Sequence, residues 1–172
     1  MERPVRKPNR LRGYDYGQPG CYFVTICTKD RVPLFWVEDV PDTGVGADII
    51  RPRPIQLSDL GLIVENAILE MPRRYANVTL DQYVIMPNHV HILLTLGEQN
   101  GRMISAPTKG LSTIVGQMKR AVSKLAHMDV WQKGYHDHVV RNDADYLRIW
   151  DYIETNPAKW REDRYYCPEE GR

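Results

Sequence analysis

The sequence has few of the features that mark secreted, disulfide-stabilised or membrane proteins. Its 172 residues include three cysteines, Cys21, Cys27 and Cys167, and no CxxC pair, so neither a disulfide framework nor a structural zinc site is indicated. The longest largely apolar run covers residues 90–96, with His91 and Thr95 inside it, far short of the roughly 20 residues that cross a bilayer. The basic, proline-rich start lacks the apolar segment of a signal peptide. We therefore expect a cytoplasmic protein without a membrane span.

The chain also has little net charge, +1 from 23 Lys and Arg against 22 Asp and Glu, with 42% hydrophobic residues. This composition is typical of a globular protein and excludes a disordered tail or a collagen-like repeat. The charge is unevenly placed, however, because a basic arm over residues 1–18 contains Arg3, Arg6, Lys7, Arg10 and Arg12. We expect these cations to follow a phosphate backbone and Tyr14 and Tyr16 to stack on bases, unless the arm is only a solvated tail.

The order of predicted elements indicates one domain over residues 1–172. Strand-like composition covers residues 21–28, 78–86, 89–96 and 130–141, and helical periodicity covers 58–71, 111–125 and 143–155. The order β-α-β-β-α-β-α predicts a ferredoxin-like, split βαβ arrangement of the α+β class. We expect an antiparallel sheet with helices on one face and an added C-terminal helix. Residues 41–54, rich in proline and glycine, predict a surface loop.

Two histidines stand at the start of the most apolar predicted strand. Side chains at i and i+2 of a strand share a face, so His89 and His91 point the same way while Val90 points into the core. They could be strand histidines satisfied by hydrogen bonds. Unpaired imidazoles at this position would be costly, however, and a divalent metal is a suitable partner. A second pair, His136 and His138, passes the same test, and we assign it mainly to structure or substrate contact.

The last predicted helix carries a phenol and an amide on one side. Tyr152 and Asn156 are four residues apart, so they lie one above the other beside the apolar arc of the helix. Taken singly, Tyr152 could be a half-buried aromatic and Asn156 a helix stop before Pro157. Together they place a phenol and an amide beside the buried face, where a neighbouring helix could supply the third donor of a metal site.

Several segments carry a resemblance to a known family. The stretches MPNHVHILL at residues 86–94 and YIETN at 152–156 resemble the HUH single-tyrosine transposases, and most closely the REP-associated tyrosine transposases. LRGYDY at 11–16, VWQKGYHDHV at 130–139 and Arg141 are similar to that subfamily as well. The match runs in the right order over nearly the whole chain.

The resemblance implies a DNA strand-transfer enzyme. His89 and His91 match the histidines that hold a divalent metal at the scissile phosphate, Tyr152 matches the nucleophile, and Asn156 matches the amide of the REP-associated branch. Members cut single-stranded DNA beside palindromic (REP-like) hairpins, leaving a 5′-phosphotyrosine and a free 3′-hydroxyl. They need no nucleotide cofactor and occur as monomers or homodimers. Two imidazoles and an amide oxygen with open positions favour Mg²⁺ or Mn²⁺ over a closed zinc site.

Some alternatives remain open at this stage. Tyr135 is the main rival for the role of nucleophile. Lys119 and Arg120 lie on the polar side of the second predicted helix, where they either contact DNA or are merely solvated, and His138 is a further candidate for DNA contact. Two other functions compete with strand transfer: a non-catalytic nucleic-acid-binding module on the same fold, and a metal phosphodiesterase that uses water in place of tyrosine.

Overall fold

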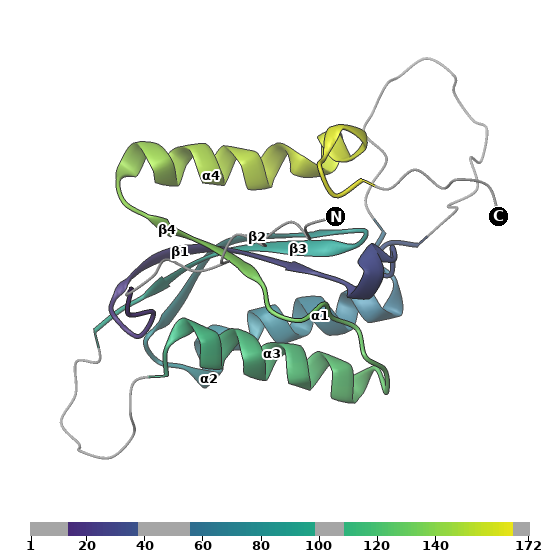
Figure 1. Ribbon diagram of the computed structural model, residues 1–172, viewed down its shortest axis with the longest axis horizontal. Helices are drawn as coiled ribbons and strands as arrows, with labels where there is room; N and C mark the ends of the chain where they lie inside the picture. The colour runs from purple at the N-terminus through teal and green to yellow at the C-terminus, as the bar shows by residue number, and fades with distance from the viewer. Residues whose placement is uncertain (1–13, 38–55, 99–108, 167–172) are drawn as a thin grey trace, which may run out of the picture.

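The computed structural model describes residues 14–37, 56–98 and 109–166 (Figure 1). The arm residues up to 13, the predicted loop at 41–54 and Cys167 lie outside these ranges. The strands are β1 (Gly20–Cys27), β2 (Val78–Met86), β3 (His89–Leu96) and β4 (His136–Val140). The helices are α1 (Asp59–Leu69), α2 (Met71–Arg74), α3 (Leu111–Leu125) and α4 (Asp143–Thr155), with 3₁₀ turns η1 (Lys29–Arg31) and η2 (Asn156–Glu162).

The four strands form one antiparallel sheet in the order β2-β3-β1-β4. This is the strand order of a split βαβ fold and confirms the α+β prediction. Helices α1 and α3 cover one face of the sheet, and the added helix α4 covers the other (Figure 1). Within the described ranges no helix has both the length and the apolar character needed to span a membrane.

Local sequence signals explain most of the element boundaries. The Ser58 hydroxyl accepts a hydrogen bond from the Gly61 N–H at 3.0 Å and caps α1, and Asn142 caps α4 in the same way through the Asp145 N–H at 2.9 Å. The predicted strands at 78–86 and 89–96 and the predicted helices at 111–125 and 143–155 are confirmed. These segments combine strong periodicity with clear end signals.

Two predicted boundaries were wrong. The first helix ends at Leu69 instead of continuing to residue 71. A separate short helix, α2, begins at Met71 with Pro72 in its first turn, where a backbone N–H has no partner within the helix and proline is therefore tolerated. The predicted strand at 130–141 is shortened to β4. Gly134 has a φ of +76° and interrupts the extended backbone, so Trp131 before it forms only an isolated bridge with Thr28.

Strand β3 is buried on both faces and separates two apolar clusters. Val90, Ile92 and Leu94 belong to the main core beneath α1 and α3. On the other face, Leu93 packs with Ile149 and Ile153 of α4 in a smaller cluster. Because side chains alternate along a strand, the histidines of β3 lie on the α4 side. The fold therefore places them between the sheet and the helix that carries Tyr152.

One tight backbone approach gives a stability test of this packing. A Cβ added at Gly61 would lie 2.3 Å from the Phe35 carbonyl oxygen, whereas one at Gly116 of α3 would meet only a flexible arginine end at 3.8 Å. We expect Gly61→Ala to lower the free energy of unfolding by about 1–3 kcal/mol through overpacking. Gly116→Ala should be neutral or raise it by up to about 1 kcal/mol through helix propensity. Urea unfolding of both variants measures this, and equal effects would contradict the described contact.

Candidate functional site

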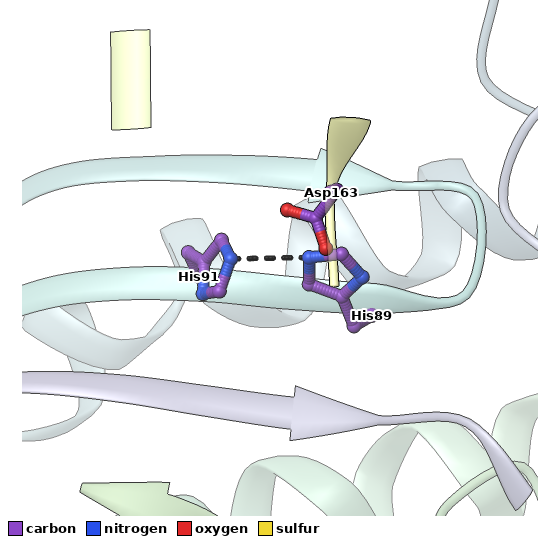
Figure 2. A group of neighbouring side chains, drawn as sticks. All are labelled: His89, His91 and Asp163. Atoms are coloured by element: carbon purple, nitrogen blue, oxygen red, sulfur yellow. Dashed lines mark hydrogen bonds between the residues drawn. The ribbon is translucent and has the colours of Figure 1, made fainter. Parts of the chain in front are cut away.

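The two imidazoles of β3 face each other across a short gap. The Nε2 atoms of His89 and His91 lie 3.1 Å apart, and both side chains are almost completely buried. Figure 2 shows the rings side by side on the strand, with the Asp163 carboxylate directed at them from the segment after η2. The structure thus brings together the pair that strand alternation predicted.

Neighbouring side chains fix the orientation of both rings. The Oδ1 atom of Asn88 lies 2.9 Å from His89 Nδ1, and an amide oxygen can only accept, so this nitrogen carries the hydrogen. The lone pair of His89 Nε2 therefore points into the site. The Thr25 hydroxyl lies 2.8 Å from His91 Nδ1 and orients that ring. Such partners on the far nitrogens are typical of metal-binding histidines.

Burial keeps both imidazoles neutral. Desolvation lowers the pKa of His89 to about 4, with the nearby Asp163 carboxylate acting in the opposite direction. Desolvation also lowers the pKa of His91 well below its usual value, and the proximity of His89 adds to this effect. Neutral imidazole is the form that binds metal ions, so the pair is ready to act as ligands at pH 7.

Three side chains from the C-terminal part of the chain meet the histidines. The Tyr152 hydroxyl lies 3.3 Å from His91 Nε2 and donates to Asp163 Oδ2 at 3.3 Å. Asn156 Nδ2 donates to the same Asp163 oxygen at 3.2 Å. The other oxygen of Asp163 accepts from the Tyr165 N–H at 2.7 Å. The phenol of α4 therefore lies beside the imidazole pair, with a carboxylate between it and the amide.

This group has the composition of a site for a divalent cation. Ligand atoms of His89, His91 and Asp163 all lie within 4.8 Å of one another. The amide oxygen of Asn156 is buried and has no hydrogen-bond partner among the described residues, a costly arrangement that a cation would relieve. Nitrogen and oxygen donors in this mixture suit Mn²⁺ or Mg²⁺ with water or phosphate in the remaining positions. The residues present thus fit a divalent metal ion.

The sequence did not single out Asp163. It follows Pro157 in a stretch of mixed charge, and nothing in the periodicity distinguishes it from the neighbouring Glu162. The turn η2 folds back under α4 and places Asp163 near His89 and His91. The one available signal was a carboxylate shortly after the tyrosine and asparagine pair.

The surroundings of Tyr152 keep its hydroxyl protonated. Its ring packs edge-on against Phe23, with centroids 6.1 Å apart, and lies 5.2 Å from the His91 ring. Burial, followed by the Asp163 charge, raises the pKa of Tyr152 to about 12. The side chain is nevertheless 36% exposed. The phenol is therefore reachable from solvent but needs a proton acceptor to become a nucleophile.

The rival residues lie elsewhere. Tyr135 belongs to the main core, and its hydroxyl lies 3.1 Å from that of Ser112 on α3. His136 is exposed, and His138 lies 2.7 Å from the Asp145 carboxylate, with which it pairs when protonated. The second histidine pair is thus not combined with Tyr152 or Asn156.

The predicted DNA contacts fall into three groups. Arg3, Arg6, Lys7, Arg10 and Arg12 lie outside the described residues. Tyr16 is 9% exposed in the main core, and Tyr14 packs against it with ring centroids 5.0 Å apart. Lys119 donates to the carbonyls of Gln132 and Gly134, each at 2.7 Å, and like Arg120 it lies on α3. Helix α3 covers the face of the sheet opposite α4 (Figure 1).

Comparison with known proteins gives three relatives and a structural neighbour, although no family profile matches the chain. A protein of Haemophilus influenzae Rd described as uncharacterized is 34% identical over 94% of this chain and 93% of its own length. A second protein of that organism, provisionally named a REP-associated tyrosine transposase, is 22% identical over 84% of this chain and 74% of its own length. The REP-associated tyrosine transposase of Escherichia coli K12 is 26% identical over 56% of this chain and 54% of its own length.

One solved structure similar to this chain is a REP-associated tyrosine transposase bound to a REP hairpin. It superposes with a TM-score of 0.61 at 22% identity and covers 88% of this chain and 73% of its own chain. This likeness shows a shared fold.

The buried histidines predict that stability depends on pH. Because the pKa of His89 falls from 6.5 to about 4 on folding, the unfolded chain binds more protons than the folded one between these values. Stability is therefore lost as the pH falls through this window. We expect the free energy of unfolding in EDTA to drop by roughly 2 kcal/mol between pH 7.5 and 5. The double variant His89→Gln/His91→Gln should show a smaller drop in urea titrations. An equal drop in both proteins would contradict neutral burial of the pair.

Proposed function

We propose that this chain, a member of the REP-associated tyrosine transposase family by its relatives, cuts and rejoins single-stranded DNA through Tyr152. The observation that carries this proposal is the meeting of the Tyr152 hydroxyl with His91 Nε2 at 3.3 Å. The chemistry requires a nucleophile next to a site that activates a phosphodiester. This contact joins the two.

In the proposed reaction His89, His91 and Asn156 hold a divalent cation, Mg²⁺ or Mn²⁺, and Asp163 adds a carboxylate to the set. The bound cation supplies Lewis-acid polarisation of the scissile phosphate. Asn88 and Thr25 hold the imidazoles in place through their Nδ1 atoms. Two of the ligands come from β3, and the other two come from η2 and the residue after it, directly behind the helix that carries Tyr152. Docking this C-terminal part of the chain on the sheet therefore assembles ligands and nucleophile together.

Tyr152 attacks the phosphorus. A bond forms between the phenolic oxygen and phosphorus while the bond from phosphorus to the 3′ oxygen breaks, which leaves a 5′-phosphotyrosine and a 3′-hydroxyl. The phenol proton is held toward Asp163 Oδ2, which is well placed to accept it as the nucleophile forms. Because the phosphotyrosine conserves the energy of the diester, the reverse step rejoins strands without a nucleotide cofactor.

The proposed substrate is single-stranded DNA with a palindromic hairpin. Support comes from the structural neighbour of this fold, which is bound to a REP hairpin. The basic arm with Arg3, Arg6, Lys7, Arg10 and Arg12, together with Tyr14, remains the proposed contact for the DNA beside the hairpin. A reaction on cellular DNA agrees with a cytoplasmic location.

Covalent trapping tests the nucleophile. Incubation with a 3′-labelled hairpin oligonucleotide from the DNA flanking the gene, in Mn²⁺, should give a labelled protein band that resists denaturation. Tyr152→Phe should abolish it, because the phenyl ring lacks the attacking oxygen. Tyr146→Phe, on the same helix but within the small apolar cluster, should leave it intact.

Three other outcomes would overturn part or all of this proposal. An adduct of undiminished yield in Tyr152→Phe would assign the nucleophile to another residue. Free 5′-phosphate products with repeated turnover in that variant would indicate a phosphodiesterase that uses water. Hairpin binding without any cleavage by the native protein would indicate a non-catalytic module.

Titration calorimetry with Mn²⁺ in the absence of DNA tests the ligands. Asp163→Asn keeps the shape of the side chain but removes the charged donor, so we expect binding to weaken tenfold or more. Glu162→Gln removes an exposed carboxylate one residue away and should bind Mn²⁺ like the native protein. Equal weakening of Mn²⁺ binding in both variants would contradict a ligand role of Asp163, because it would show that the loss of negative charge near the site is enough to weaken binding.

A further inference from the structure

A buried tyrosine with two arginines around it adjoins the imidazole pair. The ring of Tyr165 lies 4.5 Å from the ring of His89 and is 4% exposed. The guanidinium carbons of Arg31 and Arg164 lie 5.3 and 4.6 Å from its centroid. Such distances are typical of cation–π contacts. Arg31 and Arg164 are called the arginine pair below.

The backbone around the arginine pair is tied to the site. Asn88, whose side-chain oxygen orients His89, donates through Nδ2 to the carbonyls of Arg31 at 3.1 Å and Tyr165 at 2.8 Å. Arg31 closes the turn η1 with a φ of +58°, a conformation that costs free energy for a residue with a side chain. One amide therefore holds both arginine-bearing segments next to His89.

The charges of the arginine pair are unbalanced. Both side chains are exposed, and within residues 14–37, 56–98 and 109–166 neither guanidinium forms an ion pair with a carboxylate. Both also lower the pKa of His89, so their charge reaches the site. Two cations beside a candidate cation site repel its occupant unless an anion lies between them. Guanidinium groups match the geometry of phosphate oxygens, which makes DNA phosphate the fitting anion.

The position of the arginine pair relative to Tyr152 decides which part of the DNA it meets. The Tyr152 ring lies 5.2 Å from His91, whereas the Tyr165 ring is closer to His89, at 4.5 Å, than to His91, at 6.2 Å. The ring of Tyr152 and the ring of Tyr165, over which both guanidinium groups lie, are therefore at opposite ends of the imidazole pair. In phosphoryl transfer the attacking and leaving oxygens are roughly in line, so the leaving 3′ oxygen faces away from Tyr152.

We infer that Arg31 and Arg164 bind backbone phosphates of the strand that ends in the released 3′-hydroxyl, next to the buried ring of Tyr165. This inference rests on the proposed function and adds a positioning role to it. While the phosphotyrosine persists, the arginine pair keeps the 3′-hydroxyl near the phosphorus. Rejoining then occurs when that oxygen attacks phosphorus and gives its proton to solvent, while the bond from phosphorus to the phenolic oxygen of Tyr152 breaks and this oxygen takes back the proton that Asp163 accepted during cleavage.

Retention of the released strand gives the direct test. With a 5′-labelled hairpin oligonucleotide the label stays on the strand that ends in the 3′-hydroxyl, and filter binding after cleavage measures how much of it remains on the protein. We expect Arg31→Gln and Arg164→Gln to form the covalent adduct but to release this strand several-fold faster. Rejoining should fall in parallel. Arg73→Gln, which removes a guanidinium paired with Glu70 on α2, should behave like the native protein.

Salt dependence gives a second readout. In anisotropy titrations with labelled single-stranded dT12, the slope of log K against log[KCl] should decrease by about 0.7 for each arginine removed. Mn²⁺ affinity without DNA should be equal or higher in both variants, since a nearby positive charge is lost. That result also shows that the site is still folded.

The outcomes separate the two proposals. Normal strand retention and an unchanged salt slope in Arg31→Gln/Arg164→Gln, with the adduct still forming, would overturn the role of the arginine pair and leave the proposed function standing. Weakened Mn²⁺ binding in these variants would also overturn it, because it would reveal a structural effect on the site. No adduct in the native protein would overturn the proposed function and, with it, the assignment of the strand.

Discussion

The site depends on the contact between two neutral imidazoles, whose Nε2 atoms lie 3.1 Å apart in a buried position. Neither ring can turn away, because Asn88 and Thr25 hold the opposite nitrogens. Two such groups would be costly to bury without hydrogen bonds, and the protein avoids this cost through the Asn88 and Thr25 contacts while it packs the pair between the sheet and α4. The result is a preorganised pair of nitrogen donors that need not lose a proton before a metal binds.

Asn88 extends this constraint beyond the imidazoles. Its side chain makes three hydrogen bonds, to His89, to the turn η1 and to the segment after η2. Segments distant in sequence are thereby fixed relative to one another by a single amide. This explains how a carboxylate and two guanidinium groups from irregular backbone can be placed beside a strand with the precision that the proposed phosphate chemistry requires.

The parts of the fold that the sequence predicted are those set by local patterns. The hairpin around Pro87 and helix α4 have strong periodicity and clear end signals, so their bounds could be read directly. The start of β4 could not be predicted in this way, because it depends on the φ of Gly134 and on pairing with the distant strand β1. His89, His91, Tyr152 and Asn156 could be grouped because strand and helix periods set their directions. Asp163 and Arg164 follow a 3₁₀ turn whose course is set by tertiary contacts, and no period describes it.

The burial of β3 on both faces has a consequence for how this chain can vary. Because one face carries the imidazoles and the other carries Val90 and Ile92, inserting or deleting one residue at the Pro87–Asn88 turn would exchange the two sets. The imidazoles would then enter an aliphatic interior, and branched hydrocarbons would replace the donors beneath α4. Variation in this hairpin is consequently restricted to changes of side chain, and its length is fixed by the chemistry it supports.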